Sequence, residues 1–448
     1  MSLWIHHQID ASVPRPFMDE EFHVDQTKHY CSNDFGYWNP KITTPPGLYL
    51  VSYALLRLIS SITNLPTVYL CTVSVLRLLN IGLAGLLYLT IVALQRSINH
   101  QLSAKDSDRV LLTAANVCMF PILYFFIFLY YTDLLSTLSV LVMYLLLLYD
   151  RICLSAMTGG LACTMRQTNI IWCAFCCGIT LVDRFNQRLK GLSRLERESQ
   201  PTNGDWLKMI RTAGFGDVAE AFLRSVMEFV PFMALGLAFS VFVLWNHGIV
   251  LGDKGAHQPC FHAVQLFYCV MFLVIFAFPV LFLPRHFFSC LQHIVRHPGA
   301  YALLCCGIAL AVYACTFEHP YLLADNRHLT FYVWRKWFKR YVAARYLLIP
   351  LYVYGFHAVW MSLSRQNSFW RSAYFVAVAL VTVPNRLLEL RYFIMPYVFW
   401  RLHVPILSKK RLVVELLFYT VVNAGVICLF LFRTFKWVGN DDTQRIMF

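Results

Sequence analysis

Charged side chains are scarce in this sequence. Asp, Glu, Lys and Arg make up 14% of its 448 residues, whereas a typical soluble domain carries about 25%. Hydrophobic residues make up 58% and aromatic residues 16%. So little polar surface cannot cover a water-soluble globule of this length, and apolar runs recur along the whole chain. The composition therefore predicts an all-α polytopic membrane protein in which residues 1–448 form a single membrane-embedded domain.

Sequence motifs for several common kinds of site are also missing. We find no Gly-x-x-x-x-Gly-Lys phosphate loop, no Gly-x-Gly-x-x-Gly after a predicted strand, no Gly-x-Ser-x-Gly turn and no His-Glu-x-x-His metal motif. His257, Cys260 and His262 have a spacing compatible with metal ligands, but the signal is weak without paired Cys-x-x-Cys motifs. We therefore expect no metal ion and no nucleotide cofactor.

The cysteines and the net charge point away from two other classes of protein. Most of the 15 cysteines lie within apolar runs, where they act as small apolar side chains and not as a disulfide framework. Cys31 and Cys260 lie in polar segments, and a bond between them is left open. The net charge of +14 does not indicate nucleic-acid binding, because the basic residues sit mainly in short segments between apolar runs.

Apolar stretches close to the roughly 20 residues of a membrane-spanning helix occur throughout the chain. The best candidates are 69–95, 110–131, 222–245, 263–283, 299–316, 341–361, 372–388 and 412–432. Shorter candidates are 134–149, 152–165, 170–182 and 392–405, and segment 47–63 is typical of an interfacial helix.

The basic residues also predict which side of the membrane each connecting segment faces. They gather in segments 96–109, 183–221, 284–298 and 406–411, which by the positive-inside rule face the cytoplasm. Of these, 183–221 is the one long hydrophilic stretch and predicts a solvated cytoplasmic loop. The opposite, luminal side then receives segment 17–46 as the first luminal loop, together with 246–262 and 317–340.

The luminal segments are rich in ionisable groups at the edge of the bilayer, where such groups are costly and indicate function. If residues 19–30 form a helix, Asp19, His23, Gln26 and Tyr30 share one face, which is either part of a site or a solvated surface. Arg166 lies between two apolar runs, where it either pairs with Asp133 or binds a ligand.

A basic cluster on the luminal side is opposite to the positive-inside expectation. Its members are Arg327, Arg335, Lys336, Lys339 and Arg340. Such a cluster is suited to a lipid-linked phosphate, and the alternative is anchoring to ordinary anionic head groups.

Several long motifs occur in one order along the chain. They are Met-Asp-Glu-x-Phe-His (18–23), Trp-Asn-Pro-Lys-Ile-Thr-Thr-Pro-Pro-Gly-Leu-Tyr (38–49), Tyr-Tyr-Thr-Asp (130–133), Arg-Gln-Thr-Asn-Ile-Ile-Trp (166–172), Gly-Asp-Lys-x-x-His (252–257), and His-Pro-Tyr-Leu-Leu-Ala-Asp-Asn-Arg-His (319–328) with Phe-Tyr-Val-Trp-Arg-Lys (331–336). From about Phe17 to Arg401 the chain resembles the dolichyl-phosphate-glucose-dependent alpha-1,2-glucosyltransferases of the endoplasmic reticulum.

This resemblance implies the membrane-embedded C-type glycosyltransferase fold, with about 11–13 transmembrane helices and a catalytic first luminal loop. It implies glucose transfer, with inversion, from dolichyl-phosphate-glucose to the diglucosylated dolichol-linked oligosaccharide, which adds the terminal alpha-1,2 glucose used in protein N-glycosylation. The partners are then these two lipid-linked substrates and membrane lipid, with no nucleic acid. The active site of this multi-pass enzyme would face the lumen of the endoplasmic reticulum.

The resemblance also implies roles for particular residues. Asp19 is expected to be the general base, with Glu20 as second choice. Candidates for binding the donor phosphate are Arg327, His328, Arg335 and Lys336. Candidates for binding sugar or acceptor are His23, Asp133, Arg166, Asp253, His257 and Asp325. Two features depart from the family pattern: family members have a hydrophobic helix ahead of the Met-Asp-Glu motif, which residues 1–17 do not supply, and His247 stands where a small or polar residue is expected.

Two other functions are compatible with a polytopic membrane protein. A transporter or lipid flippase needs polar groups through the bilayer midplane in two related halves, whereas the polar groups here gather on one side. A non-catalytic membrane regulator predicts that loss of Asp19 changes nothing.

Overall fold

The computed structural model describes residues 1–99, 106–192, 214–255, 259–318, 325–439 and 442–448. These residues are mostly helical, and the two short strands form one antiparallel hairpin near the C-terminus. The prediction of an all-α membrane protein is therefore confirmed at the level of secondary structure.

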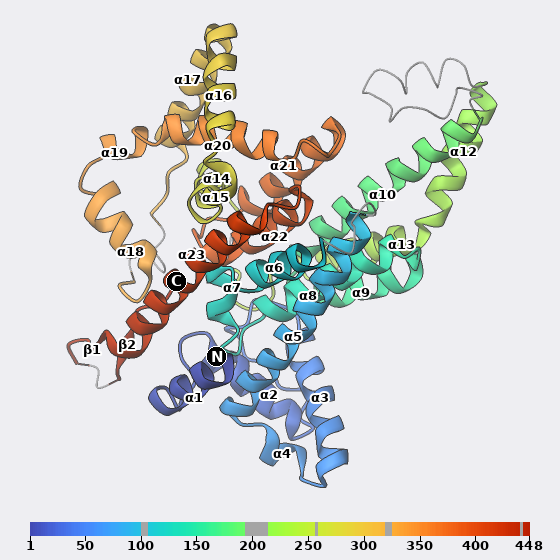
Figure 1. Ribbon diagram of the computed structural model, residues 1–448. Coiled ribbons are helices and arrows are strands. Elements are labelled where there is room, and N and C mark those ends of the chain that lie inside the picture. The colour runs from blue at the N-terminus through green and yellow to red at the C-terminus, as the bar shows by residue number, and fades with distance from the viewer. Residues whose placement is uncertain (100–105, 193–213, 256–258, 319–324, 440–441) are drawn as a thin grey trace.

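The N-terminal elements gather at one end of the molecule, at the bottom of Figure 1. They are α1 (Ser2–Ser12), α2 (Glu20–Cys31), α3 (Gly47–Thr63) and α4 (Thr67–Leu70). Although residues 1–17 contain no long apolar run, α1 is ordered, because Ile5 and Ile9 are buried against α5 and α23. A disulfide between Cys31 and Cys71 ties the end of α2 to the start of α5. The partner considered for Cys31, Cys260, is a free thiol, so that alternative was wrong.

The central helices follow in sequence and pack side by side (Figure 1). They are α5 (Val73–Ile98), α6 (Ser107–Cys118), α7 (Pro121–Phe126), α8 (Asp133–Leu148), α9 (Ile152–Met165) and α10 (Asn169–Leu192), followed by α12 (Phe215–Glu228) and α13 (Val230–Trp245). Segment 183–221, predicted as a cytoplasmic loop, begins within α10 and ends within α12, which are joined by an ion pair between Arg188 and Glu228. Its residues 193–213 lie outside the described residues, so the loop stays a prediction.

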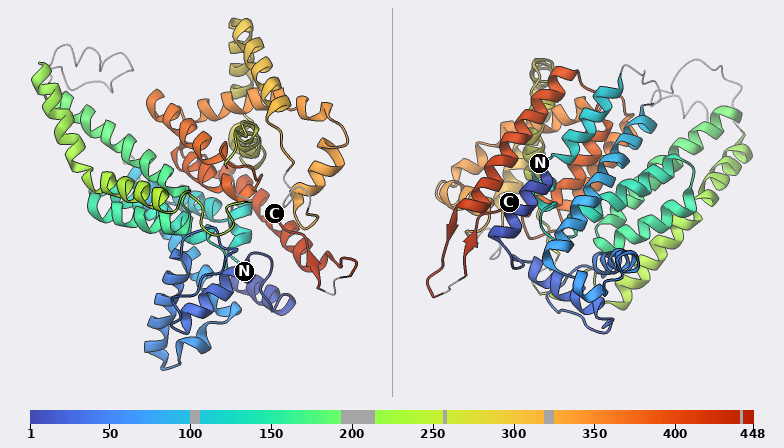
Figure 2. Two further views of the ribbon diagram at one scale, coloured as in Figure 1. Left: turned by 180° about the vertical axis from the view of Figure 1, so that it is seen from behind. Right: turned by 60° about the horizontal axis from the view of Figure 1, so that its bottom comes forward.

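The C-terminal half also packs against the central helices (Figure 2). Its elements are α14 (Val264–Phe276), α15 (Phe278–Leu281), α16 (Pro284–Arg296), α17 (Pro298–Ala314), α18 (Leu329–Val333), the π-helix η2 (Trp334–Phe338), α19 (Ala343–Tyr346), α20 (Ile349–Ser362), α21 (Ser368–Thr382), the 3-10 helix η3 (Leu390–Phe393), α22 (Ile394–His403), α23 (Lys409–Phe432), β1 (Thr434–Phe435) and β2 (Gln444–Arg445).

Several apolar runs of the sequence that are long enough to cross a membrane are interrupted in the structure by breaks between shorter helices. Among the described residues, α5 and α23 are long and apolar enough alone, and three bent helix pairs bring the total to at most five. The run 110–131 is broken between α6 and α7 at Pro121, because proline lacks the backbone donor that a helix interior needs. By helix length alone, the structure does not reach the 11–13 spans that the family resemblance implies.

Buried ion pairs join distant helices in the core. All ten residues of α22 are buried. Arg401 of α22 donates through Nε and Nη2 to the carboxylate of Glu415 in α23, at 2.9 and 2.8 Å, and Asn116 of α6 donates to the same carboxylate at 2.8 Å. A charged group with no solvent access needs such a partner. This contact therefore fixes the positions of α6, α22 and α23 relative to one another.

Candidate functional site

Asp19 lies at the N-cap of α2, at the end of a sharply bent segment. Pro14 and Pro16 exclude a helix just upstream, and Met18 adopts a left-handed backbone conformation with φ of 56°. The side chain of Asp19 is half-exposed, with 50% of its surface accessible. The predicted helix over residues 19–30 is confirmed as α2, and Asp19 is at its start and not inside it.

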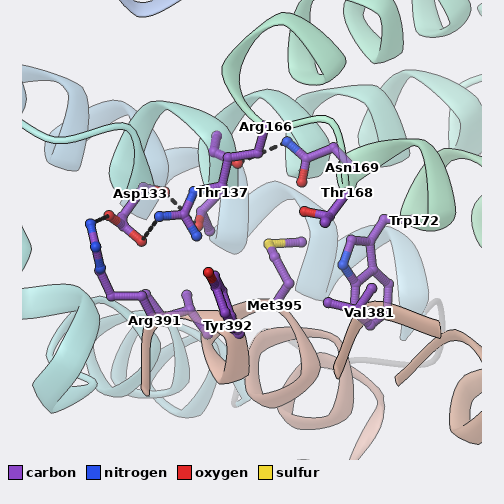
Figure 3. Close-up of a pocket in the computed structure, with 12 residues that line it drawn as sticks. Asp133, Thr137, Arg166, Thr168, Asn169, Trp172, Val381, Arg391, Tyr392 and Met395 are labelled. Atoms are coloured by element: carbon purple, nitrogen blue, oxygen red, sulfur yellow. Dashed lines mark hydrogen bonds and ion pairs between the residues drawn. The ribbon is translucent and has the colours of Figure 1, made fainter. Parts of the chain in front are cut away.

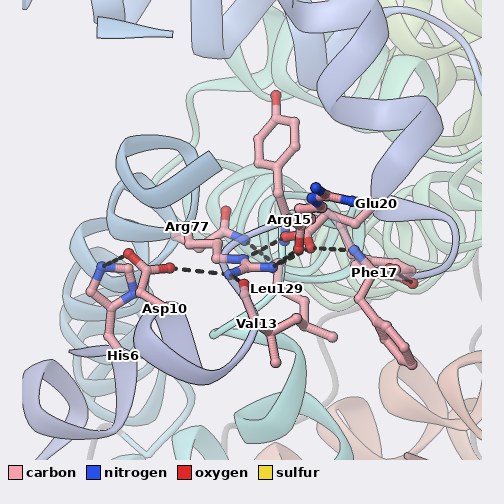
Figure 4. A network of polar contacts seen from close by, with 11 residues as sticks. His6, Asp10, Val13, Arg15, Phe17, Glu20, Arg77 and Leu129 are labelled. Atoms are coloured by element: carbon pink, nitrogen blue, oxygen red, sulfur yellow. Dashed lines mark hydrogen bonds and ion pairs between the residues drawn. The ribbon is translucent and has the colours of Figure 1, made fainter. Parts of the chain in front are cut away.

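The neighbouring Glu20 is fully buried and anchors this segment (Figure 4). Its two oxygens accept hydrogen bonds from the backbone N–H groups of Phe17 at 3.0 Å and Tyr130 at 2.8 Å. Arg77 of α5 donates to the same carboxylate through Nε at 2.8 Å and Nη2 at 2.5 Å, and through Nη1 to Asp10 of α1 at 3.1 Å. With both oxygens occupied and no exposed surface, Glu20 is placed as a structural anchor, and its second-choice role as base does not fit this geometry.

Arg391 connects Asp19 to two further carboxylates. Its Nη2 atom lies 3.3 Å from Oδ2 of Asp19, its Nη1 atom lies 3.5 Å from Oδ2 of Asp133, and it forms an ion pair with Glu389. The guanidinium also stacks against the rings of Phe126 and Tyr131, at 5.1 and 4.9 Å from their centroids. Contacts on several sides hold this largely buried cation in one orientation.

Arg166 approaches Asp133 from the side opposite to Arg391 (Figure 3). Its Nη2 atom lies 2.8 Å from Oδ1 of Asp133, and its Nε atom donates to the Thr132 hydroxyl at 3.1 Å. The predicted pair between Arg166 and Asp133 is therefore present, and Asp133 bridges two arginines. We call Asp19, Asp133, Arg166, Glu389 and Arg391 the charged cluster.

The charged cluster borders a small cavity of about 20 Å³, whose lining includes Asn169, Trp172 and Tyr392 as well as Asp133, Arg166 and Arg391. The lining comes from the start of α8, the turn between α9 and α10, and η3 with the start of α22 (Figure 3). A volume of this size holds about one water molecule. A sugar can enter only if the surrounding side chains move apart.

His23 lies on the same face of α2 as Asp19 and close to the charged cluster. Its Nδ1 atom is 2.8 Å from the hydroxyl of Tyr49, and its ring meets Tyr131 edge-on at 5.7 Å. Burial lowers the pKa of His23 to about 4, against the smaller opposing effect of Asp19, so the imidazole is neutral near pH 7. Gln26 and Tyr30, on the same predicted face, are buried, and Gln26 bonds the backbone of Tyr37 and Asn39.

Two of the predicted donor-phosphate residues, Arg327 and His328, lie in one loop, 325–329, together with Asp325, which was predicted to bind sugar or acceptor. The Arg327 guanidinium donates to the Asp325 carboxylate through Nη2 at 2.7 Å, so the two side chains form an ion pair with each other. His328 is buried, and its Nδ1 atom lies 2.9 Å from the backbone oxygen of Phe448. Burial lowers the pKa of His328, and the charges of Glu389 and Arg391 also act on it. The loop therefore lies within electrostatic reach of the charged cluster.

The remaining predicted residues lie outside the charged cluster, and one of them lies outside the described residues. Arg335 and Lys336 of η2 are exposed and lie over the rings of Phe331 and Tyr332; within the described ranges neither forms an ion pair with the cluster. Asp253 follows Gly252, where a Cβ atom would lie 2.2 Å from the backbone oxygen of Ile42, so this loop crosses directly over segment 38–43. His257 lies outside the described residues.

Metal binding gains no support from the described residues. They contain no group of three or more His, Cys, Asp or Glu side chains placed to hold a metal ion. In the candidate trio, the backbone N–H groups of Cys260 and His262 donate to the backbone of Pro384 and Val383. The absence of a metal ion remains a prediction.

Sequence reasoning missed Arg391 and Glu389. Both lie in the short turn between the predicted spans 372–388 and 392–405. The sequence patterns predict no site residue in this turn. Two ionisable residues at the bilayer edge were a signal of function by the same criterion that identified the other luminal segments.

Comparisons with known proteins find relatives over nearly the whole chain. A mouse (Mus musculus) protein named Dol-P-Glc:Glc(2)Man(9)GlcNAc(2)-PP-Dol alpha-1,2-glucosyltransferase is 38% identical, over 97% of this chain and 94% of its own. A protein of the same name from Homo sapiens is 37% identical, over 97% of this chain and 94% of its own. One from Arabidopsis thaliana is 33% identical, over the full length of this chain and 98% of its own. No solved structure matches. The sequence model of the DIE2/ALG10 family matches residues 13–402, and the chain belongs to this family.

Proposed function

We propose that this protein transfers glucose from dolichyl-phosphate-glucose to Glc2Man9GlcNAc2-PP-dolichol and forms the terminal alpha-1,2 linkage. Relatives that carry this activity in their names share more than a third of their residues with the chain over nearly full length. The observation that carries the proposal within the structure is the half-exposed carboxylate of Asp19, which pairs with Arg391, one of two arginines that line the cavity.

The reaction is a single in-line displacement with inversion. The acceptor hydroxyl oxygen bonds to the anomeric carbon of glucose while the bond from that carbon to the phosphate oxygen breaks. Dolichyl phosphate leaves with the electron pair, and the hydroxyl proton passes to a base. Because the phosphate is already a good leaving group, it needs cations to hold its charge and no proton donor.

Asp19 is the base in this scheme. It is the most exposed carboxylate of the charged cluster, whereas Asp133 has 1% and Glu389 10% of its side chain accessible. A general base must reach the proton that it removes. Entry of the substrates separates Asp19 from Arg391, which frees the carboxylate for the acceptor hydroxyl.

The cations for the phosphate come from two places. Arg391 and Arg166 line the cavity, and loop 325–329 carries Arg327 and His328 within electrostatic reach of Arg391. Arginine binds phosphate through two parallel N–H groups, which lysine cannot do. Arg335 and Lys336 lie farther out and are suited to guiding the lipid phosphate towards the site. Asp325, Asp253, His257 and His23 remain candidates for sugar contacts. No metal or nucleotide cofactor takes part in this scheme.

The proposal includes a location in the membrane of the endoplasmic reticulum, the C-type glycosyltransferase fold and a luminal active site. Two observations support the luminal placement of the charged cluster. The disulfide between Cys31 and Cys71 lies in the segment that carries Asp19, and disulfides persist in oxidising compartments. Helices α10 and α22 begin beside residues of the charged cluster and end at Leu192 and His403, at the basic segments 183–221 and 406–411, as the positive-inside rule requires if these segments are cytoplasmic.

The test is rescue of cells that lack the terminal glucosylation step, with the size of the lipid-linked oligosaccharide as readout. The chain should restore the third glucose, Asp19→Asn should not, and the matched control Asp34→Asn should behave like the parent, because Asp34 is exposed in the same luminal segment and pairs with His29. Equal rescue by Asp19→Asn and the parent would remove Asp19 as the base. Failure of all variants at normal expression would favour a regulator or a transporter.

A further inference from the structure

The C-terminal hairpin, residues 434–448 as far as they are described, extends α23 beyond the helical body (Figures 1 and 2). Strand β1 pairs with β2 in antiparallel register, Thr434 opposite Arg445 and Phe435 opposite Gln444. After β2 the chain turns back into the protein, where Met447 and Phe448 are buried. This segment lies outside the region matched by the family model.

The hairpin holds the loop 325–329 by backbone and side-chain contacts. The Met447 N–H donates to the Arg327 carbonyl at 2.7 Å, and the Leu329 N–H donates to the Met447 carbonyl at 3.0 Å. The indole N–H of Trp437 donates to Asn326 at 3.0 Å, and the guanidinium of Arg327 lies 4.8 Å from the Trp437 ring centroid. Together these contacts fix both the path of the loop and the direction of Arg327.

The same hairpin also contacts the segment that leads to Asp19. Nη2 of Arg445 donates to the Ser12 carbonyl at 2.8 Å, at the end of α1. Nη1 of Arg445 donates to the carbonyls of Phe430 and Leu431 at 2.9 and 2.8 Å, at the end of α23. Phe430 in turn meets the ring of Phe17 edge-on at 5.5 Å. One largely buried guanidinium thus joins α1, α23 and β2.

Arg445 satisfies groups that would otherwise lack partners. The last carbonyls of a helix have no partner within the helix, and a cation there also complements the helix dipole. Arg445 has 8% of its surface accessible and no acidic partner among the residues that the structure describes. Its charge is therefore stabilised by carbonyl oxygens alone, which a neutral side chain of similar length would leave unpaired.

We propose that the C-terminal hairpin is part of the donor site, and that Arg445 is a positioning residue which sets loop 325–329 at a fixed distance from Asp19. This inference rests on the proposed function, since it assigns loop 325–329 to the glucosyl donor. It also places the C-terminus in the lumen, with α23 starting at the cytoplasmic residues Lys409 and Lys410.

The kinetic test compares Arg445→Met with Lys436→Met, which removes the same charge from an exposed position on the same hairpin. Arg445→Met should raise the KM for dolichyl-phosphate-glucose about tenfold, with kcat and the acceptor KM changed by less than about threefold. Arg445→Lys should restore part of the donor KM, and Lys436→Met should match the parent. An unchanged donor KM in Arg445→Met, or an equal change in Lys436→Met, would overturn the proposal.

Two measurements decide the inference without activity, so that its failure is distinct from failure of the proposed function. Trypsin should cut the purified Arg445→Met variant after Arg327 faster than it cuts the parent or Lys436→Met, because the loop is released. A glycosylation tag appended after Phe448 should receive a glycan in microsomes. Equal cleavage in all three proteins, or an unmodified tag, would contradict the inference.

Discussion

Nη2 of Arg391 lies 3.3 Å from Oδ2 of Asp19, although 372 residues separate the two in the chain. The contact joins the start of α2 to η3 across the charged cluster. It brings the candidate base next to a cation whose position depends on Asp133, Glu389 and two aromatic rings. Every element that positions Arg391 therefore also influences Asp19.

Replacement of Arg391 should abolish most glucosyl transfer. We expect Arg391→Met to lower kcat/KM by roughly 10²–10³, the typical effect of losing one charge-stabilising donor, and Arg391→Lys to recover only part of it. The measurement is conversion of the diglucosylated to the triglucosylated lipid-linked oligosaccharide in microsomes. Arg386→Met, at an exposed position nearby, is the control. Parental activity in Arg391→Met would remove this residue from the site.

Glu20 and Arg77 should matter for stability and not for the chemical step. Removing one partner of a buried ion pair leaves the other charge uncompensated, at a cost of about 3–5 kcal/mol. Glu20→Gln and Arg77→Met should therefore each lower the melting temperature of the detergent-purified protein, and the double variant should lose less than the sum. If Glu20→Gln instead melts like the parent but fails to turn over, Glu20 acts in catalysis.

The disulfide between Cys31 and Cys71 should be present in the mature protein. It closes a separation of 40 residues, which in the chain-entropy description stabilises the native state by about 4 kcal/mol. Cys31→Ser and Cys71→Ser should have equal effects on the melting temperature, and the double variant should be no worse than either. Cys260→Ser, which removes a free thiol, should have no such effect. Additive losses in the double variant would argue against the bond.

The buried imidazole of His23 should make stability depend on pH. Its native pKa of about 4 lies below the ordinary value of 6.5, so the unfolded chain binds a proton in this interval that the native protein does not. Stability should therefore fall as the pH drops from about 6.5 to about 4, by an amount on the order of 3 kcal/mol, and level off below. His23→Gln should lose this part of the pH dependence of the melting temperature. An identical pH profile in both proteins would show that His23 does not contribute.

Local patterns in the sequence predicted local structure well. The helix over 19–30 matches α2 to within one residue, and the isolation of Arg166 between apolar runs pointed correctly to Asp133. Both predictions rest on physical needs that act over short distances: helical spacing, and the cost of leaving a charge alone at membrane depth.

Contacts between distant segments were harder to predict. Cys71 was counted as one apolar residue of the span 69–95, so its bond with Cys31 was missed. The family resemblance offers Glu20 as a second choice for the base, yet Arg77, which determines its role, lies 57 residues away. Arg391 was missed because a short turn between two apolar runs gives no sign of what it faces. Tertiary packing decides these roles, and no periodicity encodes it.

The cavity beside the charged cluster has room for about one water molecule. Water is itself a nucleophile, and a base that can deprotonate a sugar hydroxyl can also deprotonate water. An activated glucosyl phosphate held in an open, wet chamber would be hydrolysed and wasted. The glucosyl group can enter only when the lining side chains move apart, and it then fills the space that water could occupy. A lining packed this closely therefore favours the acceptor hydroxyl over solvent as the nucleophile.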